Sequence, residues 1–148
     1  MAAALMAAGT SAGLAQTAPA PVAAAPQSDA IGVELNKLEP LANGCRAYIV
    51  IDNGGERTYS TLKLDLVLFQ TDGVIGRRVA LDLSPVRAQK RSVKLFDLDG
   101  LKCDDIGSLL INDVMDCKTS GAGGASTDEP RCLERLKLAT RTKVELSK

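Results

Sequence analysis

The sequence predicts an all-β fold, a single antiparallel sandwich of about seven strands. From Ile31 onward, apolar residues recur mostly at every second position, which is the period of a half-buried strand. Turn-forming residues separate these runs at short and regular intervals, as they do in β-sandwiches. The length of 148 residues favours one such domain, and the core-forming Leu, Ile and Val residues lie mostly after Ile31.

Seven segments have the alternation or the composition of strands. The clearest is TLKLDLVLFQ, in which four leucines share one face and mostly polar or larger side chains share the other. The predicted strands span residues 31–38, 45–53, 61–70, 74–84, 91–98, 109–114 and 138–146.

Residues 106–115 fit two descriptions. Ile106, Leu109, Leu110 and Val114 have the spacing of a helical face, yet the run also fits a short strand that is buried on both sides. The β-rich context favours the strand. The following segment, 118–130, is rich in Gly and Ser and predicts a flexible loop.

Turn residues fix the connections between these strands. Asp72-Gly73 lies between two alternating runs and predicts a tight hairpin, because the favoured turn needs positive φ. The segment 52–57, DNGGER, predicts a second turn. Pro85 marks the end of a strand, since proline cannot donate a hydrogen bond within a central ladder.

The first 30 residues differ from the rest. Residues 1–15 are apolar and rich in small side chains, with a plausible cleavage site after Ala15, and so resemble an export signal. A signal normally begins with a basic part; here the first lysine or arginine is Lys37, as expected for a truncated start. Residues 16–30 alternate Ala and Pro and predict a disordered linker. The domain then spans 31–148, and no segment is long and apolar enough for an integral membrane span.

The middle of the chain resembles a known family. Residues 47–96 look like the FxLYD-type immunoglobulin-like modules of exported bacterial proteins. The features that carry this resemblance are Asn53, the 62–69 run, Asp72-Gly73 and Pro85. Where the family has Tyr-Asp after the aromatic residue, this chain has Gln70-Thr71. The whole chain is also similar to small uncharacterised exported bacterial proteins with this layout of cysteines. Both resemblances imply an immunoglobulin-like sandwich, and neither implies a particular chemistry.

Four cysteines in a chain with an export-like start predict two disulfides. In a sandwich of this kind the second and fifth strands are antiparallel neighbours, so Cys45 and Cys103 come together at their ends. Cys117 and Cys132 then bracket the Gly/Ser segment and close it. A zinc site or a redox motif needs cysteines a few positions apart, and Cys103 and Cys117, the closest pair, are 14 positions apart.

The residue types present argue against an enzyme. The chain has no histidine, which is the usual general base near neutral pH and the commonest metal ligand. It has no nucleophile motif and no phosphate-binding glycine loop between a strand and a helix. We therefore expect no catalytic residues and no cofactor. With two Phe, two Tyr and zero formal charge, we expect no nucleic-acid binding.

Acidic residues concentrate after the fifth predicted strand and form the candidate cation site. The acidic cluster comprises Asp97, Asp99, Asp104, Asp105, Asp113 and Asp116. Calcium prefers six to eight oxygens from a shaped loop, but the spacing here does not follow the EF-hand pattern. The favoured interpretation is a solvated, turn-forming cluster. The alternatives are a cation-dependent surface or carbohydrate binder and a hydrolase with a carboxylate pair.

Basic residues gather along the fourth and fifth predicted strands and their connection. The basic group comprises Arg77, Arg78, Arg87, Lys90, Arg91 and Lys94. This group could form an interaction patch for an acidic partner. An equally good interpretation is that these charges protect exposed strands from aggregation. The sequence as a whole predicts an exported, non-catalytic module for binding or assembly in the bacterial cell envelope. Its location is then the periplasm or the exterior, and its partner an unknown envelope protein or surface.

Overall fold

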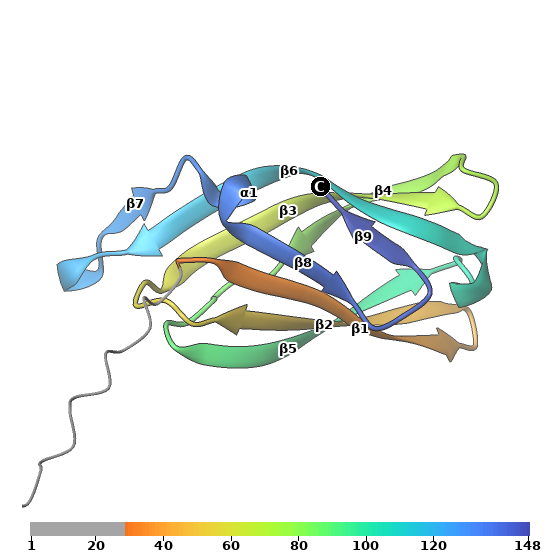
Figure 1. The fold of residues 1–148 in the computed structure, drawn as a ribbon, viewed down its shortest axis with the longest axis horizontal. Coiled ribbons are helices and arrows are strands. Elements are labelled where there is room, and N and C mark those ends of the chain that lie inside the picture. The colour runs from red at the N-terminus through yellow and green to blue at the C-terminus, as the bar shows by residue number, and fades with distance from the viewer. Residues whose placement is uncertain (1–28) are drawn as a thin grey trace, which may run out of the picture.

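The computed structural model describes residues 29–148, and most of those residues form two packed β-sheets (Figure 1). The predicted signal-like segment and most of the linker lie outside these residues. The predicted disorder of the linker therefore falls outside the described part of the chain. One sheet has the strand order β5-β2-β1-β8, and the other has β4-β3-β6-β7 with β9 also paired to β6. The strands are β1 Ile31–Leu41, β2 Gly44–Asn53, β3 Tyr59–Gln70, β4 Ile75–Asp82, β5 Lys90–Asp99, β6 Ile106–Ser120, β7 Ser126–Asp128, β8 Leu136–Thr140 and β9 Glu145–Ser147.

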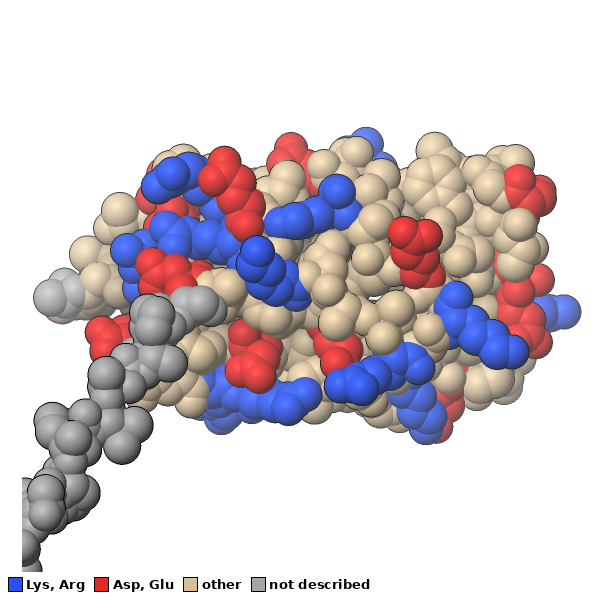
Figure 2. All heavy atoms as spheres, viewed as in Figure 1, with Lys and Arg blue, Asp and Glu red and all other residues tan. Residues whose placement is uncertain are grey.

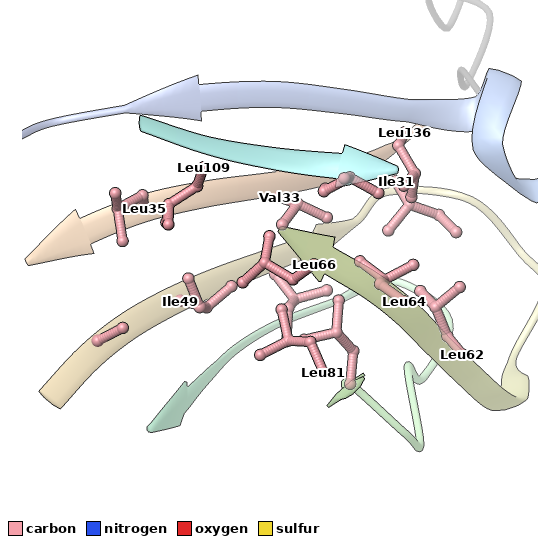
Figure 3. Close-up of a cluster of buried hydrophobic side chains, with 14 of the residues drawn as sticks. Ile31, Val33, Leu35, Ile49, Leu62, Leu64, Leu66, Leu81, Leu109 and Leu136 are labelled. Atoms are coloured by element: carbon pink, nitrogen blue, oxygen red, sulfur yellow. The ribbon is translucent and has the colours of Figure 1, made fainter. Parts of the chain in front are cut away.

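The predicted all-β sandwich is confirmed, and its core lies between the two sheets. Alternation directs one side chain of every two inward, as Figure 3 shows for leucines and isoleucines of both sheets. The four leucines of the clearest run are all buried, and they face residues such as Val33 and Ile49 across the gap. Burial of these apolar surfaces supplies the main stabilisation of the fold.

Two connections agree with the turn residues of the sequence. At the β3–β4 hairpin, Gly73 has a φ of 83°, and the Val74 N–H donates to the Asp72 carboxylate at 3.0 Å. Asp72-Gly73 therefore forms the predicted tight turn. Pro85 follows the end of β4 at Asp82, as predicted.

Residues 106–115 are a strand, in agreement with the favoured interpretation. That strand, β6, is longer than predicted and continues to Ser120. A 3₁₀ turn at Ala122–Gly124 then leads into β7, which pairs antiparallel with the end of β6. The Gly/Ser segment predicted as a flexible loop is therefore a hairpin over most of its length.

The last predicted strand, 138–146, is wrong as a single element. β8 ends at Thr140 and pairs parallel with β1, whereas β9 begins at Glu145 and pairs parallel with β6 in the other sheet. The turn between them is built by threonine hydroxyls: the Thr142 N–H donates to Thr140 Oγ1 and the Val144 N–H to Thr142 Oγ1, each at 3.1 Å. The alternating sequence continues through this turn, so alternation alone could not locate it.

Both predicted disulfides are present. Cys45–Cys103 joins the start of β2 to the 3₁₀ turn Cys103–Asp105, which follows β5. Cys117–Cys132 joins β6 to the short helix α1, Cys132–Arg135. The first bridge thus anchors one end of the sandwich, and the second closes the β6–β7 hairpin.

Candidate binding surface

The solvent side of the β5-β2-β1-β8 sheet carries the candidate site, here called the outer face. Alternation turns every second residue of each strand outward, and the register places Tyr48 opposite Leu95 and Val50 opposite Val93. The outer face comprises Glu34, Lys37 and Glu39 of β1, Arg46, Tyr48, Val50 and Asp52 of β2, and Arg91, Val93, Leu95 and Asp97 of β5.

The centre of the outer face is apolar and open to solvent. Val93 is 54% exposed and Leu95 is 49% exposed, although both belong to a regular strand. Beside them, Val50 is buried and Tyr48 is half-buried. Exposed apolar residues that stand together on one face indicate an interaction site more strongly than isolated ones do.

Ordered charge pairs border this apolar centre. Arg46 donates two hydrogen bonds to the Asp97 carboxylate, at 2.6 and 2.9 Å. On the other side, the Tyr48 hydroxyl donates to Glu39 at 2.6 Å, and Lys37 Nζ lies 2.8 Å from the same carboxylate. Lys37 also stands 5.1 Å above the centre of the Tyr48 ring. The polar border is therefore held in one arrangement before any partner arrives.

The carboxylates of this border are fixed negative charges. The hydrogen bonds from Arg46 lower the pKa of Asp97, and those from Lys37 and Tyr48 lower the pKa of Glu39. The hydrogen bond to Glu39 raises the pKa of the Tyr48 hydroxyl. Near neutral pH both acids are ionised and the phenol is neutral, so this surface is arranged to recognise a partner by charge and shape rather than to move protons.

The structure does not gather the acidic cluster into one site. Asp97 belongs to the outer face, Asp104 and Asp105 lie in the 3₁₀ turn, and Asp113 and Asp116 lie on β6 of the other sheet. Asp99 is the last residue of β5. Within residues 29–148, no three His, Cys, Asp or Glu side chains are grouped so that they could hold a metal ion.

The basic group is likewise divided. Arg78 and Arg91 point to opposite faces of the sandwich, and Lys94 donates to the Ser84 carbonyl at 2.5 Å. Arg77 lies on β4, Arg87 lies between β4 and β5, and Lys90 begins β5. In the view of Figure 2, basic and acidic side chains alternate across the surface, so neither sign dominates that face.

Sequence reasoning missed a buried acid on the other sheet. Asp65 is 4% exposed and accepts two hydrogen bonds from Arg78, at 2.6 and 2.7 Å, and one from Asn112 at 2.8 Å. The hydrogen bonds from Arg78, then Asn112, lower the pKa of Asp65. An aspartate in the middle of the leucine-rich run was the available signal, because an acid there needs a partner.

A cleft of about 610 Å³ lies at the end of the sandwich, between β1, the 3₁₀ turn and the turn before β9. Leu38, Ile106 and Val144 form its apolar part. Two of its cations, Lys37 and Arg141, are engaged with Glu39 and Glu34, and Lys143 and Asp104 also line the cleft. The outer face remains the stronger candidate.

Comparison with known proteins supports the fold and nothing narrower. No family model and no curated protein matches the chain. Among solved structures, the chain is similar to IrmA from Escherichia coli, with a TM-score of 0.53 and 13% identity over 74% of this chain and 90% of that one. The resemblance to FxLYD-type modules stays a prediction. Across residues 29–148, no helix is long and apolar enough to cross a membrane.

Proposed function

We propose that this chain is an exported, non-catalytic β-sandwich that acts as a binding or assembly module in the bacterial cell envelope. Its binding surface is the outer face. The observation that carries this proposal is the apolar centre at Val93 and Leu95, bordered by charge pairs that are already ordered. Protein interfaces have the same plan, with an apolar core enriched in Tyr and Arg and a polar rim.

The two disulfides support export. Disulfides form and persist in oxidising compartments and are rare in the bacterial cytosol. Both bridges join segments that are distant in sequence, 58 and 15 positions apart, so they contribute to the stability of the domain as a whole. Cell fractionation with thiol labelling tests this point: recovery of the protein in the cytosol with free thiols contradicts export.

The chemistry of the outer face supports a non-catalytic role. The carboxylates of Glu39 and Asp97 are ionised near neutral pH and are already paired, and the chain offers no histidine as a base. Binding, by contrast, benefits from side chains that are ordered in advance, because less entropy is lost when the partner docks.

A photo-crosslinking experiment in living cells tests the surface. Replacing Tyr48 with benzoylphenylalanine puts a reactive ring at the apolar centre, and replacing Met115 puts the same ring at an exposed apolar position on the other sheet. We expect defined adducts with an envelope component from position 48 and none from position 115. Equal adducts from both positions, or none from position 48, overturn the proposal.

A further inference from the structure

β5 is an edge strand with an unpaired backbone. It pairs with β2 along all ten residues from Lys90 to Asp99, and no described strand lies beyond it. In Figure 1 it forms the lower margin of the molecule. An exposed strand of this length with apolar side chains offers a row of N–H and C=O groups to another extended chain.

The odd-numbered residues of β5 present their backbone groups to this free edge. The Gly100 N–H donates to the Asn43 C=O at 2.8 Å, which sets the phase of the β2–β5 ladder. Since hydrogen-bonded and non-hydrogen-bonded pairs alternate in an antiparallel ladder, even-numbered residues bond to β2. The N–H and C=O groups of Arg91, Val93, Leu95 and Asp97 therefore point away from β2, while their side chains stand on the outer face.

The sequence of these four residues is complementary to itself. When two copies of β5 run antiparallel about a two-fold axis at Lys94, Arg91 faces Asp97 of the second copy and Val93 faces its Leu95. The axis repeats both pairings, as in any two-fold contact. Moving the axis by one residue, to Val93 or Leu95, keeps the odd-numbered residues paired but places Arg91 opposite Leu95 or Val93 opposite Asp97, so apolar residues then face charged ones. Moving it by two, to Ser92 or Phe96, destroys the match, because Arg91 then faces Val93 or Val93 faces Asp99.

We propose that a second copy of this chain docks along β5, antiparallel, with the two-fold axis at Lys94. The inference rests on the proposed function, because it names one partner of the binding module. Docking would join the two four-stranded sheets into one of eight strands. Main-chain bonds between Val93 and Leu95 and between Arg91 and Asp97 hold the edges together, and the apolar centres of the two outer faces become continuous.

The charges near the axis tolerate this arrangement. Asp97 already lies against Arg46 on its own chain, and Arg91 of the second copy adds a cation on its free side. The two Lys94 side chains meet at the axis on the inner side of the sheet. Each donates to the Ser84 carbonyl of its own chain at 2.5 Å, which draws the ammonium toward that carbonyl.

Disulfide trapping tests the register. In a hydrogen-bonded antiparallel pair the Cα atoms are about 5.5 Å apart, which suits a disulfide. We expect the double variant Val93→Cys/Leu95→Cys to form a covalent dimer under mild oxidation. The double variant Arg91→Cys/Leu95→Cys is the register control, since neither position faces the other across the axis. Equal crosslinking of both variants, or none of the first, overturns the proposal.

A charge swap tests the pairing without cysteines. Arg91→Asp places two aspartates opposite each other in the dimer, and Asp97→Arg places two arginines opposite each other. We expect either variant alone to raise the dimer Kd by about tenfold or more in sedimentation experiments. A mixture of the two restores dimerisation, because every pair between the different copies is again Arg with Asp.

A control variant and melting curves show whether a change in Kd comes from the β5 edge. Lys137→Asp changes an exposed cation on β8, at the opposite edge of the same sheet, and should leave the Kd unchanged. Thermal melting shows that each variant is folded, which matters for Asp97→Arg because Arg46 loses its partner. A wild-type chain that stays monomeric, or a mixture that does not recover, overturns the dimer. Adducts from position 48 would then still support the proposed function.

Discussion

Asp65 shows how a single residue constrains one sheet. It stands in a strand of leucines, buried, with Arg78 of β4 and Asn112 of β6 bonded to its carboxylate. Its two partners come from the strands on either side, so this one carboxylate connects three strands through side chains. A buried acid with several donors specifies the register of its neighbours, because no shifted pairing supplies the same donors.

Replacing this acid should destabilise the protein. In Asp65→Asn the amide cannot accept both bonds from Arg78, and the guanidinium loses its counter-charge. We expect a lower melting temperature than for Asp116→Asn, which changes a more exposed β6 aspartate whose nearest cation, on Lys118, is 3.7 Å away. Equal melting temperatures for the two variants would show that the Asp65 contacts do not stabilise the fold.

Carboxylate pKa values predict how stability depends on pH. Hydrogen bonds lower the pKa values of Glu34, Glu39, Asp65 and Asp97 in the folded protein. The unfolded chain therefore binds protons more readily as the pH falls, and the stabilisation is lost as the pH falls through the folded pKa values. We expect constant carboxylate stabilisation above about pH 5 and a decline below about pH 4. Urea unfolding at pH values above and below this range measures the decline, and Asp65→Asn should flatten it.

At the scale of elements, β6 meets the end of β3 in a close approach of the two backbones. A side chain added at Gly107 would place its Cβ 2.5 Å from the Gln70 carbonyl oxygen, which belongs to the backbone. We expect Gly107→Ala to destabilise the protein by about 1–3 kcal/mol, as overpacking does. Gly54→Ala is the control, because nothing lies within 4 Å of its added Cβ. Chemical denaturation compares them, and a neutral Gly107→Ala would contradict the close approach.

The strands could be predicted where side chains alternate and turns have distinctive residues. The leucines of β3 and the Asp72-Gly73 turn meet both conditions, so the sequence predicts that hairpin, with the four leucines on one face. The sequence did not reveal that 138–146 changes sheets, because Thr140 and Thr142 alternate like strand residues while their hydroxyls build a turn. The outer face was missed for a related reason: it forms only when the β2–β5 register brings Leu95 beside Tyr48.

For the whole molecule, the two disulfides should differ in their effect. By chain entropy, the bridge that closes 58 positions contributes about 4 kcal/mol and the one that closes 15 about 3 kcal/mol. We expect Cys45→Ala/Cys103→Ala to lower the free energy of unfolding more than Cys117→Ala/Cys132→Ala does. Denaturant titration of both variants checks this order. The reverse order would indicate that the smaller bridge does more than restrict the unfolded chain.

The crossing of the chain between the sheets also determines when the domain can assemble. β8 lies beside β1 and β9 beside β6, so each of the two layers is completed by strands within Leu136–Ser147. During synthesis, β1 and β6 therefore each lack one neighbour until β8 and β9 have been made, and pairing between distant segments is slow in any case. Both sheets are therefore complete only after Glu145–Ser147 has left the ribosome, so the sandwich reaches its final pairing after synthesis of its last strand.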